Sequence, residues 1–378
     1  MQCREFTLPK QRLPKIVGQK FVAMKLRDGF MDRSWADYIS YLVKKDPMPL
    51  LPNPDTIIES GTLKTLLPMW LSNFSDNLPY IKNGDKTAVT HPEGGFSLSI
   101  SDLAEEPVTA VPKGTAIVIG RGPSVFKHKH LDLLAEAIQS RKYLGKICAS
   151  DGMLIDCLQK NIIPDLTVSV DGAPIIKKWF NHPLVKEHGS ELNVVLPVTI
   201  HNSVYQICVE NRCKVHWYLP LFDSIECNES FTRIMRGLTR TAKYPDGLVM
   251  SQAGGNAGAF AWIMAVDLLK RSPVALIGID FGYPEGTNLE TTPYFSNVTN
   301  TSQIDDLYKD IYHPYFKTYA RIDMVFSHYR KAFLDMQKQT PIWYHQAGGT
   351  INATEGGTLF GERITCMNFA DFLKEYKV

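Results

Sequence analysis

The amino-acid sequence predicts an α/β protein built on an open, mostly parallel sheet with helices on both faces. The first observation is a series of short apolar, β-branched segments without alternation of polar and apolar residues, which is typical of strands buried on both faces. The second is that segments with helical spacing of apolar residues separate these strands over about 170 residues. The third is that small, glycine-bearing or acidic residues follow most of the strands.

The strands and helices are expected to alternate from Thr115 onward. The expected strands are 115–119, 146–149, 166–170, 193–199, 214–219, 248–251 and 274–279. The expected helices are 130–144, 151–160, 203–210, 255–270, 319–337 and 368–376. A glycine-rich turn region at 347–361 precedes the last helix. This order predicts an open, mostly parallel sheet with helices on both faces, and the length of the chain fits one large α/β domain plus an appendage, or two domains.

Three parts of the chain are expected from these patterns. They are an N-terminal extension or small subdomain at 1–112, a nucleotide-binding core at 113–300 and a helical C-terminal region at 301–378 that completes the site. Within the extension, Ser34 is placed to cap a helix that runs to Lys45. A second helical stretch at 59–73 is interrupted by Pro68.

Composition and charge place the chain among ordinary globular proteins. Of its 378 residues, 44% are hydrophobic and 21% are charged, and the net charge is +2. This charge excludes a dedicated nucleic-acid binder. No apolar run is long enough to span a membrane, and no signal-peptide core precedes the first elements. Seven cysteines without a C-x-x-C pair indicate reduced thiols, so we expect a cytoplasmic protein without a membrane span.

Candidate functional residues lie directly after the expected strands, because open α/β sheets bind ligands beyond the carboxyl ends of their strands. The segments found there are Gly120–Ser124, Ser150–Asp151, Asp171–Gly172, Ser251–Asn256 and Asp280–Gly282. Asp165 precedes its strand, so we expect it at the opposite end of the sheet.

The G-x-G-P-S turn predicts a phosphate cradle. Gly120 and Gly122 allow a tight turn with N–H groups available to an anion, and Pro123 and Ser124 lead into a helix start that favours phosphate. The turn lacks the G-K-[ST] of a Walker A loop and the third glycine of the dinucleotide fingerprint. A tight strand-to-helix turn without a ligand is the alternative.

A second glycine loop opens the helix that starts near residue 257. Gly254 and Gly255 permit close approach of a ligand, and Asn256 is expected to hydrogen-bond a base, ribose or phosphate. Asp151 is a further candidate for nucleotide binding. A helix packed tightly on the sheet is the alternative reading of this loop.

Two aspartates, Asp171 and Asp280, each follow an apolar strand. Either is expected to act as a base, orient a ribose or hold a divalent metal ion. Capping of the next turn is the alternative for each of them.

The segment 347–357 carries two Gly-Gly pairs around polar residues. Asn352 and Thr354 are predicted to bind nucleotide, and Glu355 is predicted to be catalytic, in a polar lid over the active site. A solvent-exposed loop is the alternative.

Five of these motifs together resemble one known group. The motifs are Ile119–Ser124, Ile163–Asp171, Gly254–Asn256, Ile277–Asp280 and Asn352–Gly357, in the family's order. The group contains the motility-associated factor (Maf) glycosyltransferases and the archaeal MptE-like 6-hydroxymethylpterin diphosphokinases. The resemblance covers roughly residues 113–362 and implies a Rossmann-like core related to sialyltransferases.

The resemblance implies one of two transferase activities. Maf proteins are thought to move nonulosonic, sialic-acid-like sugars from a CMP donor to a protein or glycan acceptor, without a required cofactor. MptE-like enzymes move pyrophosphate from ATP to a pterin alcohol with Mg²⁺, which Asp171 and Asp280 would hold in this chain. We favour the glycosyltransferase, because the chain extends beyond a minimal pterin kinase on both sides and Asn352–Gly357 looks like Maf.

One departure from the resemblance concerns the general acid or base. Maf proteins often carry a histidine shortly after the segment that contains Asp280, whereas the next histidine here is His313. The sequence therefore leaves the general acid or base unassigned. Two further alternatives are an S-adenosylmethionine-dependent methyltransferase, with Asp151 on the ribose, and a non-catalytic binding protein. The oligomeric state stays open.

Overall fold

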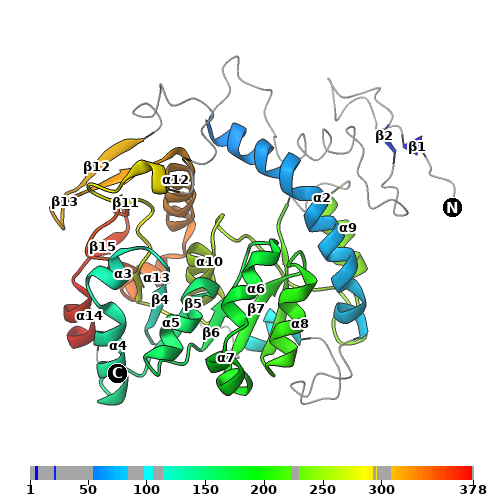
Figure 1. The fold of residues 1–378 in the computed structure, drawn as a ribbon, viewed down its shortest axis with the longest axis horizontal. Helices are drawn as coiled ribbons and strands as arrows, with labels where there is room; N and C mark the ends of the chain where they lie inside the picture. Colours follow the sequence, from blue (N-terminus) through cyan, green and yellow to red (C-terminus); the bar gives the residue numbers. More distant parts are fainter. Residues whose placement is uncertain are drawn as a thin grey trace.

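The computed structural model describes residues 5–6, 21–22, 54–83, 98–104, 114–222, 230–292, 295 and 308–376. The helix expected from Ser34 to Lys45 lies outside these residues. The described chain forms a ten-stranded sheet with helices on both faces (Figure 1). Adjacent strands in this sheet pair in parallel, so the predicted α/β, Rossmann-like fold is confirmed.

In the spatial order of the main sheet, β4 is the fourth strand from one edge. In spatial order the strands are β15 (Ile364–Cys366), β14 (Thr350–Asn352), β10 (Val274–Ile277), β4 (Ala116–Ile119), β5 (Lys146–Ser150), β6 (Leu166–Val168), β7 (Asn193–Pro197), β8 (Lys214–Pro220) and β3 (Leu98–Ser99), with β9 (Met250–Ser251) beside β8. The chain runs from β4 outward to β8 and then crosses back to β10 on the other side of β4. The strand order therefore reverses between β4 and β10.

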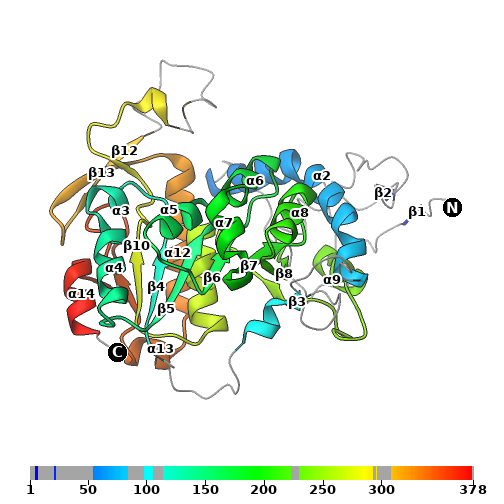
Figure 2. The same cartoon turned by 60° about the horizontal axis from the view of Figure 1, so that its bottom comes forward.

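Two smaller sheets lie outside the main one. β1 (Glu5–Phe6) pairs with β2 (Phe21–Val22), and β13 (Thr318–Ile322) pairs with both β11 (Tyr283–Pro284) and β12 (Lys309–His313). Figure 2 shows β12 and β13 above α3 (Ser124–Lys127), at the same end of the molecule. The three-stranded sheet therefore overhangs the end of the main sheet at which β4 leads into α3.

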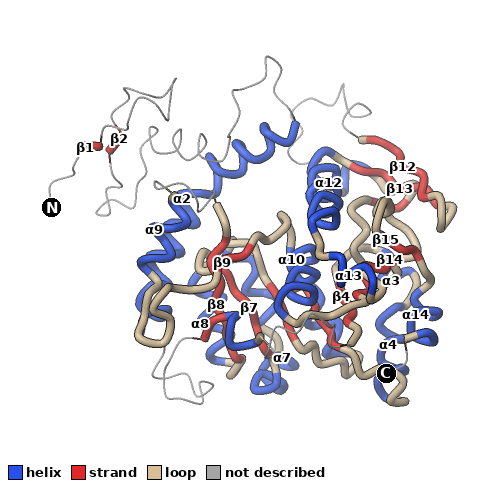
Figure 3. Tube along the Cα trace, turned by 180° about the vertical axis from the view of Figure 1, so that it is seen from behind, coloured by secondary structure: helices blue, strands red, loops and turns tan. Residues whose placement is uncertain are grey.

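Helices cover both faces of the main sheet. One face carries α4 (His130–Gln139), α5 (Leu154–Gln159), α6 (Lys177–Phe180), α7 (Pro183–His188), α8 (Asn202–Glu210) and α14 (Phe369–Glu375), with α2 (Pro54–Asn83) and α9 (Phe231–Leu238) at its edge. The other carries α10 (Ala257–Ile263), its π-helical continuation Met264–Leu268, α12 (Met324–Gln339) and α13 (Ile342–Gln346), seen in Figure 3. The short 3-10 helices are 100–103, 151–153, 174–176, 189–191 and 289–291.

The central strands explain why the sequence shows apolar runs without alternation. In β4, Ile117 and Ile119 pack with α4 and α14, while Ala116 and Val118 pack with α10 on the opposite face. All four residues are fully buried. A strand covered on both faces needs apolar residues at every position, and the run at 115–119 met that condition.

The C-terminal region differs from the sequence expectation in part. The segment expected as a helix from Tyr319 instead begins with β13, and α12 starts at Met324 after Asp323, whose carboxylate accepts from the Phe326 N–H at 2.7 Å. The region expected to be helices and turns also contributes β14 and β15 to the main sheet. Each has only three residues, too few to show a periodicity in the sequence. The boundaries of the three expected parts stay predictions.

Helix α2 is longer than expected and continues through Pro68 and Pro79. An internal proline costs a helix about 3 kcal/mol, but tertiary packing offsets this cost here. From residue 66 on, the helix buries Leu67, Leu71 and Phe74 against the core. Packing has therefore overridden the local signal on which the predicted interruption rested.

Two buried asparagines on α2 bind the loops after β6 and β7. The Asn73 side-chain amide donates to the carbonyls of Gly172 and Thr199, both at 2.9 Å. The Asn77 amide donates to the carbonyls of Val198 at 3.0 Å and Ile200 at 2.7 Å. These bonds satisfy loop carbonyls that the helix would otherwise bury without partners.

Two expectations from composition can be compared with the described chain. Within it, no helix is both long and apolar enough to cross a membrane. Its cysteines are free: Cys148, Cys157, Cys208 and Cys213 are buried, and Cys366 is half-buried.

Asp165 also lies where expected, at the start of β6, where it accepts from Lys146 and from the Ile147 N–H.

Replacing Asn77 with alanine should lower the free energy of unfolding by about 1–3 kcal/mol, because two buried carbonyls lose their donor. Urea unfolding measures the change. The matched control is Asp76→Ala on the exposed side of the same helix, which should change stability by less than about 0.5 kcal/mol. Equal effects of the two substitutions would show that α2 is not held to the core by this amide.

Candidate functional site

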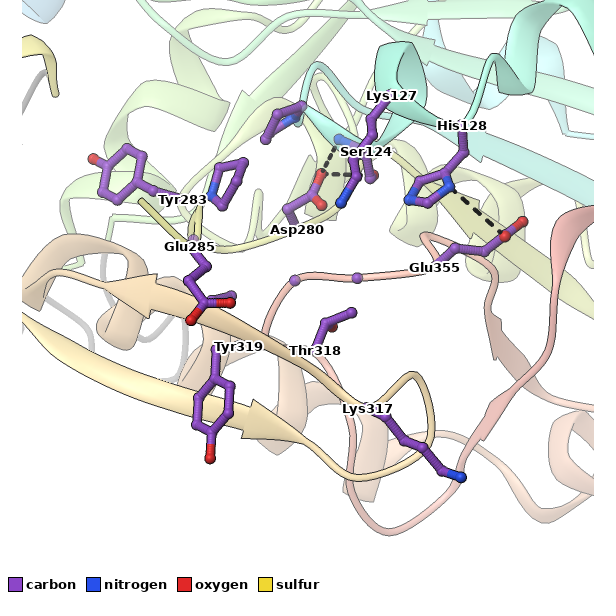
Figure 4. Close-up of a pocket in the computed structure, with 16 residues that line it drawn as sticks. Ser124, Lys127, His128, Asp280, Tyr283, Glu285, Lys317, Thr318, Tyr319 and Glu355 are labelled. Carbon is purple, nitrogen blue, oxygen red and sulfur yellow. Dashed lines mark hydrogen bonds and ion pairs between the residues drawn. The ribbon is translucent and has the colours of Figure 1, made fainter. Parts of the chain in front are cut away.

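A pocket of about 320 Å³ lies at the carboxyl ends of β4, β10 and β14, where the strand order reverses. Four segments line it, and Figure 4 shows their side chains. The lining residues are Pro123, Ser124, Lys127, His128, Asp280, Gly282, Tyr283, Pro284, Glu285, Lys317, Thr318, Tyr319, Ala320, Glu355, Gly356 and Gly357. Ligands of open α/β sheets bind at this kind of reversal point, so we take the switch-point pocket as the candidate active site.

Of the glycine turn, Pro123 and Ser124 line the switch-point pocket, whereas Gly120 and Gly122 do not line it and do not form a free anion cradle. The Gly120 N–H donates to the Ile277 carbonyl at 2.9 Å, and the Gly122 N–H donates to the Gly278 carbonyl at 2.8 Å. A Cβ atom on Gly122 would lie 1.7 Å from Asp280 Oδ2. The glycines therefore let the ends of β4 and β10 meet, and their two N–H groups are not available to an anion as expected. The role of Gly120 and Gly122 in nucleotide binding stays a prediction.

Asp280 occupies the helix start at which a phosphate was expected. The Ser124 hydroxyl donates to Asp280 Oδ2 at 2.8 Å, and the Ser124 N–H lies 3.4 Å from the same oxygen. Burial raises the pKa of Asp280 to about 7, and the hydrogen bonds from Ser124 and the charge of Lys127 act in the opposite direction. Near neutral pH this carboxyl group therefore exchanges a proton readily, as a general acid or base must.

The glycine-rich segment forms a wall of the pocket and docks on Asp280. The Thr358 N–H donates to the Asp280 carbonyl at 2.8 Å. Asn352 and Thr354, predicted to bind nucleotide, are fully buried and bond to each other, with the Thr354 hydroxyl 2.8 Å from Asn352 Oδ1. They hold the shape of the segment, whereas Glu355 reaches the pocket.

Glu355 is held by three neighbours beside the pocket. His130 Nε2 lies 3.3 Å from Oε1, the Phe369 N–H donates to the same oxygen at 3.0 Å, and His128 Nδ1 lies 3.9 Å from Oε2. These contacts, the His130 hydrogen bond first, lower the pKa of Glu355. The predicted catalytic carboxylate is thus ionised at neutral pH and faces a histidine.

Asp171 lies apart from the switch-point pocket. It is exposed, and its carboxylate accepts from the Ala173 N–H at 2.9 Å. This is the contact expected of a residue that caps the next turn. Asp171 follows β6, and two strands separate β6 from β10, so it stands about 14 Å from Asp280 along the sheet. The two aspartates therefore do not fit a shared Mg²⁺ site. Among the described residues no group of three or more His, Cys, Asp or Glu side chains is placed to hold a metal ion.

Asp151 also lies outside the switch-point pocket. It is buried after β5, where it accepts from the Ser169 hydroxyl at 2.5 Å and from the Gly152 N–H at 2.7 Å. Burial raises its pKa to about 6. Its proposed role in nucleotide binding stays a prediction.

The second glycine loop caps helix α10. Gly254 and Gly255 have φ values of 61° and 80°, and a Cβ atom on Gly255 would lie 2.8 Å from the Tyr329 ring. Asn256 Oδ1 accepts from the Ala259 N–H at 2.9 Å. These are the contacts of the packing alternative, and the loop does not line the switch-point pocket.

A family model described as 6-hydroxymethylpterin diphosphokinase MptE-like matches residues 98–286, which is half of the chain. The match includes the glycine turn and Asp280, and of these residues Pro123, Ser124 and Asp280 line the pocket. The chain belongs to this family. Membership places it in a superfamily of transferases, as the resemblance of the five motifs implied. No curated protein matches the chain.

The fold is also found in a solved structure, that of the Maf glycosyltransferase from Magnetospirillum magneticum AMB-1. The two share 13% sequence identity with a TM-score of 0.50, over 84% of this chain and 43% of that chain. This chain therefore spans less than half the length of that protein. At this identity the likeness shows the fold alone.

Sequence reasoning missed several residues of the switch-point pocket. Lys127 and His128 lie in a short basic run, which is typical of a solvent-facing surface, although their spacing from Ser124, three and four residues on, puts all three on one helix face. Lys317 comes from the turn between β12 and β13, which gave no recognisable signal. His313 is buried, with contacts to the Leu359 carbonyl and the Phe316 N–H, so it does not supply the missing acid or base.

The raised pKa of Asp280 predicts a pH-dependent stability. The folded chain keeps this proton up to about pH 7, whereas a carboxyl in the unfolded chain loses it near 3.8. The resulting stabilisation is complete below about pH 4 and is lost as the pH rises through 7. Between pH 5 and pH 8, Asp280→Asn should therefore gain about 2–3 kcal/mol relative to wild type in urea unfolding.

The control for this measurement is Asp246→Asn, which changes an exposed carboxyl group. Its stability relative to wild type should stay constant over the same range. A constant difference for Asp280→Asn as well would mean that the pKa of Asp280 is not raised in the folded protein.

Proposed function

We propose that the chain transfers a nonulosonic, sialic-acid-like sugar from a CMP donor to a hydroxyl group of a protein or glycan acceptor in the switch-point pocket. The observation that carries the proposal is the meeting of the Ser124–Asp280 pair with Lys127 at the point where the strand order reverses. A cation, a hydroxyl donor and a carboxyl with a pKa of about 7 together suit transfer between a phosphate leaving group and a hydroxyl nucleophile.

The charges of the pocket fit a donor with a single phosphate. Lys127 lies close enough to Asp280 to lower its pKa, and the two side chains stand side by side with Ser124 in Figure 4. A phosphate placed here would meet the Lys127 ammonium beside the Ser124–Asp280 pair. It would also favour the protonated form of Asp280, which can then donate a hydrogen bond to it. Lys317 at the rim supplies a second cation, suited to the sugar carboxylate.

The proposed step is a single displacement. The acceptor oxygen forms a bond to the anomeric carbon while the bond from that carbon to the phosphate oxygen breaks. The bonding pair leaves with CMP, and the hydroxyl proton passes to a base. Asp280 is proposed to hold a sugar or acceptor hydroxyl in line. Because Lys127 offsets the charge of one phosphate, this reaction requires no metal ion.

Pyrophosphoryl transfer from ATP to a pterin alcohol is the second candidate, and the family match favours it. A triphosphate carries more charge, which Mg²⁺ usually neutralises. Mg²⁺ is commonly held by one or two carboxylates and the substrate phosphates. In the switch-point pocket Asp280 would be that ligand, without Asp171. No feature of the pocket specifically favours the methyltransferase or the non-catalytic alternative.

Calorimetric titration of CMP and of ATP, each in EDTA and in Mg²⁺, separates the two candidates. We expect CMP to bind in EDTA, and Lys127→Gln to weaken that binding about 10- to 100-fold, since a charged hydrogen bond contributes about 1.5–3 kcal/mol. Lys129→Gln is the matched control, because Lys129 is exposed and does not line the pocket. Tight ATP binding that requires Mg²⁺ and disappears in Asp280→Asn would replace glycosyl transfer with pyrophosphoryl transfer.

A further inference from the structure

We propose that His128 is the base that takes the proton from the acceptor hydroxyl, and that Glu355 is its positioning residue. The inference rests on the proposed function only in that the acceptor is a hydroxyl, which both candidate reactions share. The sequence offers no histidine in the segment that follows Asp280, and His313 is buried away from the pocket. His128 reaches the same cavity from the opposite side, at the end of α3.

The geometry of His128 is that of an oriented base. It follows Ser124 by four residues, so both side chains project from one face of the short helix α3 into the pocket. Its Nδ1 lies 3.9 Å from Glu355 Oε2. Figure 4 shows the other ring nitrogen directed towards the interior of the pocket, where Asp280 lies. A histidine with one nitrogen facing a carboxylate at ion-pair distance and the other facing the substrate side is arranged for proton transfer.

Glu355 is fixed independently of His128. Its Oε1 accepts from the Phe369 N–H at the start of α14 and lies 3.3 Å from His130 Nε2. Its backbone has a φ of 58°, an uncommon conformation for a residue other than glycine, and the buried Asn352–Thr354 pair holds the preceding turn. The second oxygen, Oε2, is left on the side of His128.

His130 contacts both His128 and Glu355. Its side chain is fully buried, its ring stacks on His128 at 5.6 Å between centroids, and it meets the Phe369 ring edge-on at 5.2 Å. Its Nδ1 is buried and has no hydrogen-bond partner in the described part of the chain. An N–H at Nδ1 would be unsatisfied, so the arrangement favours the tautomer that donates from Nε2 to Glu355.

The groups around His128 suit a base at neutral pH. Burial lowers its pKa below 6.5, Glu355 raises it, and His130 and Lys127 lower it. Across the pocket, Asp280, Glu285 and Lys317 are the other charged side chains that line the cavity. The ring is therefore uncharged at pH 7 and has a lone pair available to the acceptor.

In the proposed step the acceptor proton moves to His128 Nε2 as the acceptor oxygen bonds to the electrophilic centre of the donor. The bond to the leaving phosphate breaks, and the phosphate takes its electron pair. The imidazolium that forms is stabilised by Glu355 and later releases its proton to solvent. Asp280, held deeper by Ser124, stays a partner for a substrate hydroxyl or phosphate.

The test compares His128→Ala with wild type in CMP release from a CMP-linked nonulosonic sugar, with water as the acceptor. We expect kcat to fall at least 100-fold, as for loss of a general base. The Kd of CMP should stay within threefold of the wild-type value. Added imidazole should raise the kcat of His128→Ala at least tenfold. His188→Ala, a histidine paired with Glu191 outside the pocket, is the matched control and should leave kcat unchanged.

Glu355→Gln tests the positioning role. Loss of the carboxylate should lower the pKa of His128, so the acidic limb of the kcat–pH profile should move to lower pH while the plateau falls. NMR titration of the histidine rings in the ligand-free protein should show the same displacement for His128, identified by its loss in His128→Ala. If Glu355 had only a structural role, the midpoint of the acidic limb and the pKa of His128 from NMR would both stay unchanged.

Three results would overturn the inference: kcat of His128→Ala within threefold of wild type, loss of CMP binding in parallel with kcat, or a His128 titration that does not respond to Glu355→Gln. Failure of the proposed function looks different. In that case wild type neither binds CMP nor releases it, and the variants are compared instead in the Mg²⁺–ATP reaction with a pterin alcohol. There the same kcat and imidazole criteria support or overturn the role of His128.

Discussion

The contact between the ends of β4 and β10 is the constraint on which the site depends. The Gly120 and Gly122 N–H groups donate to carbonyls at the end of β10, and neither glycine leaves room for a Cβ atom. This contact brings Ser124 and Asp280 within hydrogen-bond distance although 156 positions separate them in the chain. The pocket, the raised pKa of Asp280 and the direction of the α3 side chains follow from that junction.

Much of the fold was predictable because the central strands are buried on both faces. Continuous apolar runs such as 115–119 and 274–279 are hard to place elsewhere in a globular protein. The strands at Thr350–Asn352 and Ile364–Cys366 were not predictable, since three residues are too few to show a period. The continuation of α2 through Pro68 depends on contacts with distant loops, which local preference does not report.

The site was predictable at the level of strand ends rather than of individual contacts. Ser124, Asp280 and Glu355 do line one pocket, because the carboxyl ends of β4, β10 and β14 are neighbours. Asp171 and Asp280 look equivalent in the sequence because both follow apolar strands. A local sequence pattern does not report the order of the strands in space, so it does not show that the two residues lie apart. His128 was overlooked because a short basic run looks like a solvated face until the direction of α3 is known.

The central claim is that the nucleotide phosphate binds in the switch-point pocket, and a crystal structure of the full chain with CMP tests it most directly. The account predicts the phosphate within hydrogen-bond distance of the Ser124 hydroxyl or the Lys127 ammonium, beside Asp280. A phosphate found instead against the Gly254–Asn256 loop or beside Asp151, with the switch-point pocket empty, would contradict it.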